Sequence, residues 1–125
     1  MKLIFEIPGK LVSGMNAREH WGSRANRAKK QREGGAEHAA NAILRWRLKQ
    51  GKGRDALPFP LVVTIIRRGK APLDSDNLAI SGKHLRDGIA DALGVDDGDE
   101  SLVTWEYRQE HAPKYSARVE IESAI

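Results

Sequence analysis

Acidic side chains are concentrated between residues 74 and 100, in the stretch DSDNLAISGKHLRDGIADALGVDDGDE. Eight carboxylates there stand against two basic residues, a local net charge of −6 in a chain whose net charge is +4. Carboxylates held close together repel one another unless a positive group neutralises them. A hard divalent cation with oxygen ligands does this in many proteins. The stretch therefore predicts a site for Mg²⁺, with Mn²⁺ as an alternative ion.

The expected ligands are Asp74 and Asp76 together with Asp97, or its neighbour Asp96 in place of Asp97. Asp74 and Asp76 fall where a strand ends and a helix begins, so an extended backbone would turn both carboxylates to one side. Asp97 follows that helix and is expected to return to the same place on a second loop. A metal held there would polarise a phosphoryl oxygen and lower the pKa of a bound water. Lys83 is expected to offset negative charge on the phosphorus.

Each acidic motif also has a purely structural explanation. An aspartate at the start of a helix, such as Asp74, often caps it, because a side-chain oxygen accepts a hydrogen bond from an unpaired backbone N–H. Asp87 and Asp91 are explained equally well as surface residues of a helix. Asp99 and Glu100 are expected to be solvated members of a polar turn. The acidic stretch acquires functional meaning only if its parts come together.

A strongly basic segment precedes the acidic one. Between Arg18 and Arg54, eleven basic residues stand against three acidic ones, a net charge of +8. Such a segment suggests a polyanionic partner, although a solvated helix surface is the alternative explanation. The residues expected to bind DNA phosphates lie in this segment and just after the next strand: Arg18, Arg24, Arg27, Lys29, Lys30, Arg67, Arg68 and Lys70.

Apolar periodicity predicts the elements that must position these side chains. A short β-branched run predicts a central strand over residues 61–66, and alternation predicts strands over residues 2–7, 102–108 and 115–122. The last two are expected to pair as an antiparallel hairpin. The order strand, broken helix, strand, helix, strand, strand predicts an α/β fold, a small mixed β-sheet with helices packed on it.

The helices are predicted from composition and from the spacing of leucines. Residues 17–50 favour helix, either as two helices or as one interrupted at Gly34-Gly35. A second helix is expected from about residue 76 to residue 93, because Leu78, Leu85, Ile89 and Leu93 share one face. Gly94 is a plausible cap at its C-terminal end.

Length and composition narrow the class of protein. A chain of 125 residues is expected to form one domain, residues 1–125. The absence of cysteine excludes disulfides and thiolate metal sites and fits a reducing cytoplasm. No apolar run is long enough for a membrane span, so no membrane partner is expected.

The ordered motifs D-S-D-N-L, K-x-x-x-D-G-I and D-D-G-D-E before a strand resemble the RusA family of phage and bacterial Holliday junction resolvases. The resemblance covers mainly residues 67–108, with a looser upstream match at Asn16, His20 and Trp21. It implies a Mg²⁺-dependent homodimer that binds four-way DNA junctions and nicks two opposed strands during recombination and repair.

Carried over to this chain, the resemblance implies catalytic roles for Asp74, Asp76 and Asp97, and matches Lys83 to the family's essential lysine. Asp87 matches the aspartate four residues beyond that lysine. The chain departs from the family in one spacing, since Lys83 lies seven residues beyond Asp76 where the family has four. On one continuous helix, both spacings return to the same face. Two alternatives remain open: a non-catalytic nucleic-acid-binding protein, and a different metal-dependent phosphoesterase.

Overall fold

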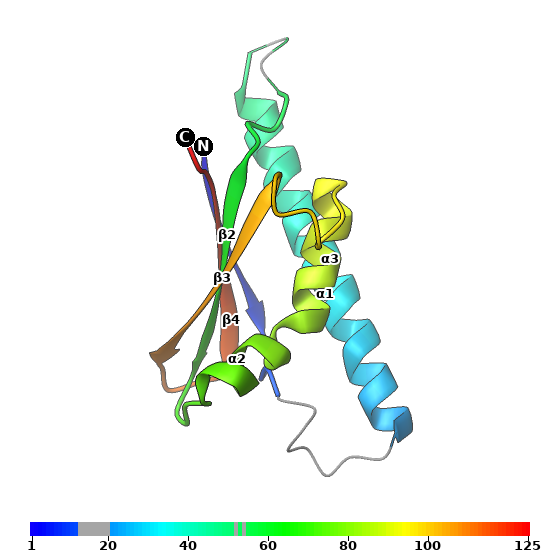
Figure 1. The fold of residues 1–125 in the computed structure, drawn as a ribbon, viewed down its shortest axis with the longest axis vertical. Helices are drawn as coiled ribbons and strands as arrows, with labels where there is room; N and C mark the ends of the chain where they lie inside the picture. The colour runs from blue at the N-terminus through cyan, green and yellow to red at the C-terminus, as the bar shows by residue number, and fades with distance from the viewer. Residues whose placement is uncertain (13–20, 52, 54) are drawn as a thin grey trace.

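The structure, a computed structural model, describes residues 1–12, 21–51, 53 and 55–125. In these residues a mixed four-stranded sheet carries helices on one face (Figure 1). The elements in chain order are β1 (Lys2–Pro8), α1 (Trp21–Lys49), β2 (Leu61–Gly69), α2 (Ser75–Ser81), α3 (Lys83–Leu93), β3 (Val103–His111) and β4 (Ser116–Ser123). The α/β class and the mixed sheet predicted from the sequence are confirmed.

The strands are arranged in the order β1-β4-β2-β3. β4 is antiparallel to both β1 and β2, whereas β2 and β3 are parallel, with Leu61 opposite Val103 and Gly69 opposite His111. The predicted hairpin between β3 and β4 is therefore wrong, because β2 lies between them. The short connection after β3 crosses the end of β2, where Ala112 N donates to Gly69 O at 3.0 Å. Alternation identified both strands but carries no information about partners.

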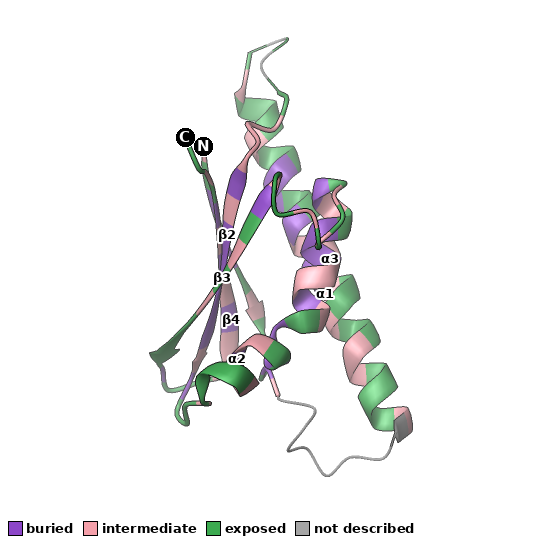
Figure 2. Ribbon diagram, viewed as in Figure 1, coloured by how far each residue is buried: buried purple, intermediate pink, exposed green. Residues whose placement is uncertain are grey.

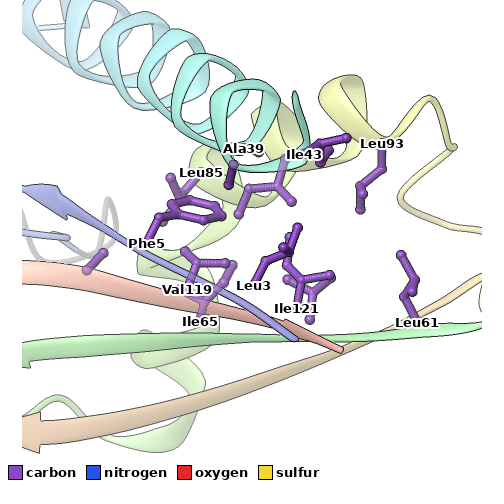
Figure 3. Close-up of a cluster of buried hydrophobic side chains, with 14 of the residues drawn as sticks. Leu3, Phe5, Ala39, Ile43, Leu61, Ile65, Leu85, Leu93, Val119 and Ile121 are labelled. Atoms are coloured by element: carbon purple, nitrogen blue, oxygen red, sulfur yellow. The ribbon is translucent and has the colours of Figure 1, made fainter. Parts of the chain in front are cut away.

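The core lies between the sheet and the pair α1 and α3 (Figures 2 and 3). Alternate residues of each strand point into it, including Phe5, Ile65 and Val119, all buried. From the helices, Ile43 and Leu85 pack against them in the same cluster. The opposite face of the sheet carries charged side chains from β2, β3 and β4. A single apolar layer therefore holds the helices on the sheet.

α1 is one helix of 29 residues that runs through Gly34-Gly35 without interruption. The expected break is absent because the glycines allow close packing here. A Cβ on Gly35 would lie 2.7 Å from the carbonyl oxygen of Leu85 on α3, and a Cβ on Gly88 would lie 2.0 Å from that of Arg32 on α1. α1 and α3 therefore lie closer together than they could if positions 35 and 88 carried side chains.

The second predicted helix is divided in two at Gly82, which ends α2 and precedes α3. A Cβ at this position would lie 2.9 Å from the ring of Tyr107, so the chain turns where it packs directly on β3. The apolar face was predicted correctly, since Leu78, Leu85, Ile89 and Leu93 are all buried. Gly94 ends α3 with φ 73°, a left-handed conformation that glycine adopts without strain.

Two adjacent glycines of α1 give a direct test of the helix contact. Gly34→Ala should raise the free energy of unfolding by up to about 1 kcal/mol, because alanine favours helix and the new Cβ meets nothing closer than Ile7 Cγ2 at 3.9 Å. Gly35→Ala should lower it by about 1–3 kcal/mol through overpacking against α3. Urea unfolding of the two variants measures both. Equal effects of the two substitutions would contradict the close approach.

Candidate active site

Asp74 and Asp76 lie at the start of α2, beyond the C-terminal end of β2. Asp74 is the helix cap: its Oδ1 accepts a hydrogen bond from Asn77 N at 2.9 Å, and its Oδ2 accepts one from Asn77 Nδ2 at 3.1 Å. Asp76, in the first turn, is exposed, and no hydrogen bond or ion pair to its carboxylate is found within the described residues. The structural explanation of Asp74 is thus correct, and Asp76 is the carboxylate left available.

The segment just before Asp74 is fixed to the edge strand β3. The side chain of Gln109 bonds both backbone groups of Leu73, accepting from its N at 3.0 Å and donating to its O at 2.7 Å. A backbone clamped on both sides cannot swing freely. The position of the Asp74–Asp76 pair is therefore set by the end of the sheet and by the helix cap together.

Asp96 and Asp97 follow α3. Asp96 Oδ1 accepts a hydrogen bond from Gly98 N at 2.9 Å, which closes a turn. Asp97 is held by Arg86 of α3, whose Nη2 donates to Asp97 O at 2.6 Å and whose Nε lies 3.5 Å from Asp97 Oδ2. Both aspartates line a depression of about 300 Å³, whose charged lining is completed by Arg32, Asp87 and Asp91.

The structure does not bring Asp74, Asp76 and Asp97 together in one chain. β2 and β3 are parallel, so the residues after β2 and those before β3 belong to opposite ends of the sheet. α3 alone, with 11 residues, spans about 16 Å between them, and Figure 1 shows α2 at one end and the α3–β3 connection at the other. A site shared by Asp74, Asp76 and Asp97 would form if β2 and β3 were antiparallel. Because they are parallel, the expectation of such a site within a single chain is wrong.

The residues fit a divalent cation in chemical type but not in arrangement. Carboxylate oxygens are the ligands that Mg²⁺ and Mn²⁺ prefer. Among the residues that the structure describes, however, no three or more His, Asp or Glu side chains converge as metal ligands. One chain supplies an incomplete set at each end.

Lys83 begins α3 and is exposed. Because the helix breaks at Gly82, Lys83 and Asp76 are on different helices, and the argument from a shared helix face does not apply. The next residue, His84, has its pKa lowered, first by burial and then by the charge of Lys83, with smaller contributions from Arg27 and Arg32 of α1. The N-terminal end of α3 is therefore surrounded by cations from both helices.

The residues expected to bind DNA fall into two classes. Arg24, Lys29 and Lys30 are exposed on the N-terminal half of α1, where Arg27 is half-buried, and Lys70 is exposed after β2. Arg18 lies outside the described residues, as do Asn16 and His20 of the upstream match.

Arg67 and Arg68 are used within the fold. Arg67 is 3% exposed, and it donates to Leu11 O at 2.9 Å and to Ala71 O at 2.6 Å. Arg68 points to the open face of the sheet, where it pairs with Glu6 at 2.8 Å and with Glu110 at 3.2 Å. Neither guanidinium is available to a phosphate in this arrangement, because a strand turns successive side chains to opposite faces and both faces already supply partners.

Two arginines outside the predicted set of site residues organise the acidic depression. Arg32 donates from Nε and Nη2 to the two carboxylate oxygens of Asp91, at 2.9 and 3.1 Å, and thereby links α1 to α3. This pairing holds the pKa of Asp91 below its ordinary value. Arg86 binds Asp97 as described above. The signal for Arg86 was its place beside the buried face of α3, next to Leu85, where an arginine must find partners.

Comparison with known proteins adds no assignment: no protein-family model matches the chain, and no curated protein matches it. None of the helices described combines the length and the apolar character needed to span a bilayer. The argument for function therefore depends on the residues and their geometry.

The division between structural and available cations can be tested with two substitutions. Arg67→Met should lower the free energy of unfolding by on the order of 2 kcal/mol, because it leaves carbonyl oxygens without their donor. Lys70→Gln should change stability by less than about 0.5 kcal/mol and should weaken binding to DNA, with a smaller salt dependence. Denaturant unfolding and binding titrations at several salt concentrations measure both. A stable Arg67→Met protein that binds DNA poorly would reverse the two roles.

The lowered pKa of His84 predicts a pH dependence of stability. The unfolded chain takes up a proton on this residue near its ordinary pKa of 6.5, and the folded chain does so only at lower pH. Stability should therefore fall as the pH drops through about 6.5, and should stop falling on this account below the folded pKa. Replacing His84 by Gln should flatten that part of the profile, as measured by urea unfolding between neutral and mildly acidic pH. Identical profiles for the two proteins would refute the prediction.

Proposed function

We propose that this protein is a Mg²⁺-dependent endonuclease that acts as a homodimer on four-way DNA junctions in recombination and repair. The observation that carries the proposal is the coincidence of two features at one end of the molecule. Asp74 and Asp76 lie there at the start of α2, and the basic N-terminal half of α1 lies at the same end (Figure 1). A phosphate backbone bound by α1 would pass near the exposed carboxylate of Asp76.

The exposed cations near this end suit a polyanion. Lys29 and Lys30 on α1, Lys70 after β2 and Lys83 at the start of α3 are all exposed, and no hydrogen bond or ion pair to Lys30, Lys70 or Lys83 is found in the described part of the chain. Long cationic side chains of this kind neutralise phosphates and set the position of DNA without reading its sequence. This favours recognition of DNA shape over recognition of base sequence.

A second chain resolves the separation of the aspartates. In a two-fold dimer, each surface of one chain meets the complementary surface of its copy twice. If the α2 end of one chain faces the Asp97 depression of the other, Asp74 and Asp76 join Asp97 of the second copy at two equivalent places. Two equivalent sites are what paired nicks in opposed strands require. The divalent cation would supply charge neutralisation and an activated water at such a site.

The non-catalytic alternative has one observation in its favour. Asp74 and Asp97 both have partners within the fold, Asn77 and Arg86 respectively. In that case the acidic residues are structural, and the protein only binds nucleic acid. Asp76 keeps the catalytic explanation in play, because no hydrogen bond or ion pair to its exposed carboxylate in the first turn of α2 is found among the described residues.

Cleavage of a synthetic four-way junction with and without Mg²⁺ is the deciding experiment. The parent protein should cleave the junction in preference to linear duplex or single strands, and only with the metal. Asp76→Asn should reduce cleavage by on the order of 10²-fold or more while keeping or improving junction binding, since repulsion of phosphate is relieved. Glu100→Gln, an exposed carboxylate outside the proposed site, is the matched control. No cleavage by the parent would leave a binding protein, and preferred cleavage of single strands would indicate another phosphoesterase.

Mixing two impaired variants tests the shared site. An Asp76→Asn chain retains Asp97, and an Asp97→Asn chain retains Asp76, so a mixed dimer regains one complete site. The mixture should nick one strand of the junction faster than either variant alone, because each variant alone lacks a complete site. If each chain carried its own complete site, no mixture of the two variants could recover activity.

A further inference from the structure

The side chain of Arg86 joins α3 to β3 and to the connection between them. It starts from α3, and its guanidinium lies over the ring of Trp105 on β3, 4.9 Å from the ring centroid. Nη1 donates to Tyr107 Oη at 3.3 Å, and Nη2 donates to Asp97 O at 2.6 Å. The side chain is only 25% exposed. An arginine held on a ring and at two hydrogen bonds has little freedom to move.

Arg86 is the anchor of the acidic turn. Within the described residues, the other hydrogen bonds of segment 96–101 stay inside the segment or join it to residues 102 and 103 at the start of β3. The bond from Arg86 Nη2 to Asp97 O ties the turn to α3. Without it, the position of Asp97 would depend on a short turn alone. The main chain at Asp97 therefore takes its place from a side chain on α3.

The same guanidinium also faces the carboxylate of Asp97. Nε lies 3.5 Å from Asp97 Oδ2 and, although buried, has no hydrogen-bond partner. No hydrogen bond to Asp97 Oδ1 is found in the described part of the chain. One carboxylate oxygen is thus turned towards Arg86, and the other is left for an outside ligand. The neighbouring Asp96 differs, because its Oδ1 already accepts from Gly98 N.

We propose that Arg86 is a positioning residue that fixes the orientation of the Asp97 carboxylate for cleavage. This inference rests on the proposed nuclease function. The role needs arginine, because the planar guanidinium presents several donors in one fork and stacks on an aromatic face. A lysine keeps the charge but lacks the planar fork whose separate nitrogens reach Tyr107 Oη, Asp97 O and the Asp97 carboxylate. Trp105 and Tyr107 supply the surface on which the fork is fixed.

Arg86→Lys and Arg86→Met separate positioning from simple attachment of α3 to β3. Both variants should cleave the junction more slowly under single-turnover conditions, by about 10-fold or more, with junction affinity unchanged. Amide hydrogen exchange at residues 96–100 should become faster in both. If Arg86 only attached α3 to β3, both substitutions would lower stability but would not slow cleavage while junction affinity stays unchanged. Arg108→Lys is the control, because Arg108 is on β3 but pairs with Glu120, 3.5 Å away.

A double substitution provides a second readout. If Arg86 acts through Asp97, the Arg86→Lys/Asp97→Asn protein should cleave no more slowly than Asp97→Asn alone, because the effects of coupled residues do not add. Additive effects of the two substitutions on the cleavage rate would overturn the proposal. So would an Arg86→Lys protein that matches the parent in cleavage rate and in amide hydrogen exchange. Either result leaves the nuclease function standing. A parent that does not cleave overturns the nuclease function, and the positioning role of Arg86 with it. Should Arg86→Met fail to fold, Arg86→Lys alone decides.

Discussion

The parallel pairing of β2 with β3 is the constraint on which the arrangement of this molecule depends. Parallel neighbours need a crossover that returns the chain to the starting end of the sheet, and here α2 and α3 form that crossover. The crossover begins at Asp74 and ends before Asp97, so it places the two acidic groups at its two ends. Only association with another chain can reunite them, which makes dimerisation a condition of the proposed chemistry.

The crossover itself is held in place by its contact with α1. The glycines at positions 35 and 88 let the backbones of α1 and α3 approach closely, and Arg32 bonds across the same contact to Asp91. On the other side of α3, Arg86 reaches to Asp97 and to Tyr107 of β3. α3 is thus attached to both neighbours by an arginine as well as by apolar packing. Each arginine also neutralises one carboxylate of a depression that would otherwise be strongly negative.

Sequence periodicity predicted those features that depend on neighbours along the chain. The strand faces, the buried leucines of α2 and α3, and the caps at Asp74 and Gly94 all follow from local geometry, and all are found. The partners of the strands could not be predicted, because an alternating strand fits either neighbour of β2 equally well. Gly34-Gly35 and Gly82 misled for the same reason: whether a glycine breaks a helix or permits close packing depends on what lies opposite.

The sequence offered candidate residues for a site but not their arrangement. The motifs identified Asp76 and Asp97, but a pattern of spacing cannot show whether two loops meet or lie apart. Contacts within the fold also occupy two expected DNA ligands. Arg67 and Arg68 are consecutive, so one points under the sheet and the other above it, and each finds acceptors there. The charge of a segment therefore overstates the charge that it offers to a partner.

The surface charge that remains has a definite polarity. On the open face of the sheet, Arg68, Arg118 and Arg108 pair with Glu6, Glu110 and Glu120, so this face is close to neutral. Lys30, Lys70 and Lys83 are exposed, and no ion pair to any of them is found in the described part of the chain. A polyanion is consequently attracted to the end where the Asp76 carboxylate is exposed, although that carboxylate repels phosphate. Opposed forces at one place favour binding in the presence of a divalent cation, since the cation converts the repulsion between phosphate and carboxylate into a shared attraction. Under the proposed function, this charge pattern links DNA binding at this end to the metal.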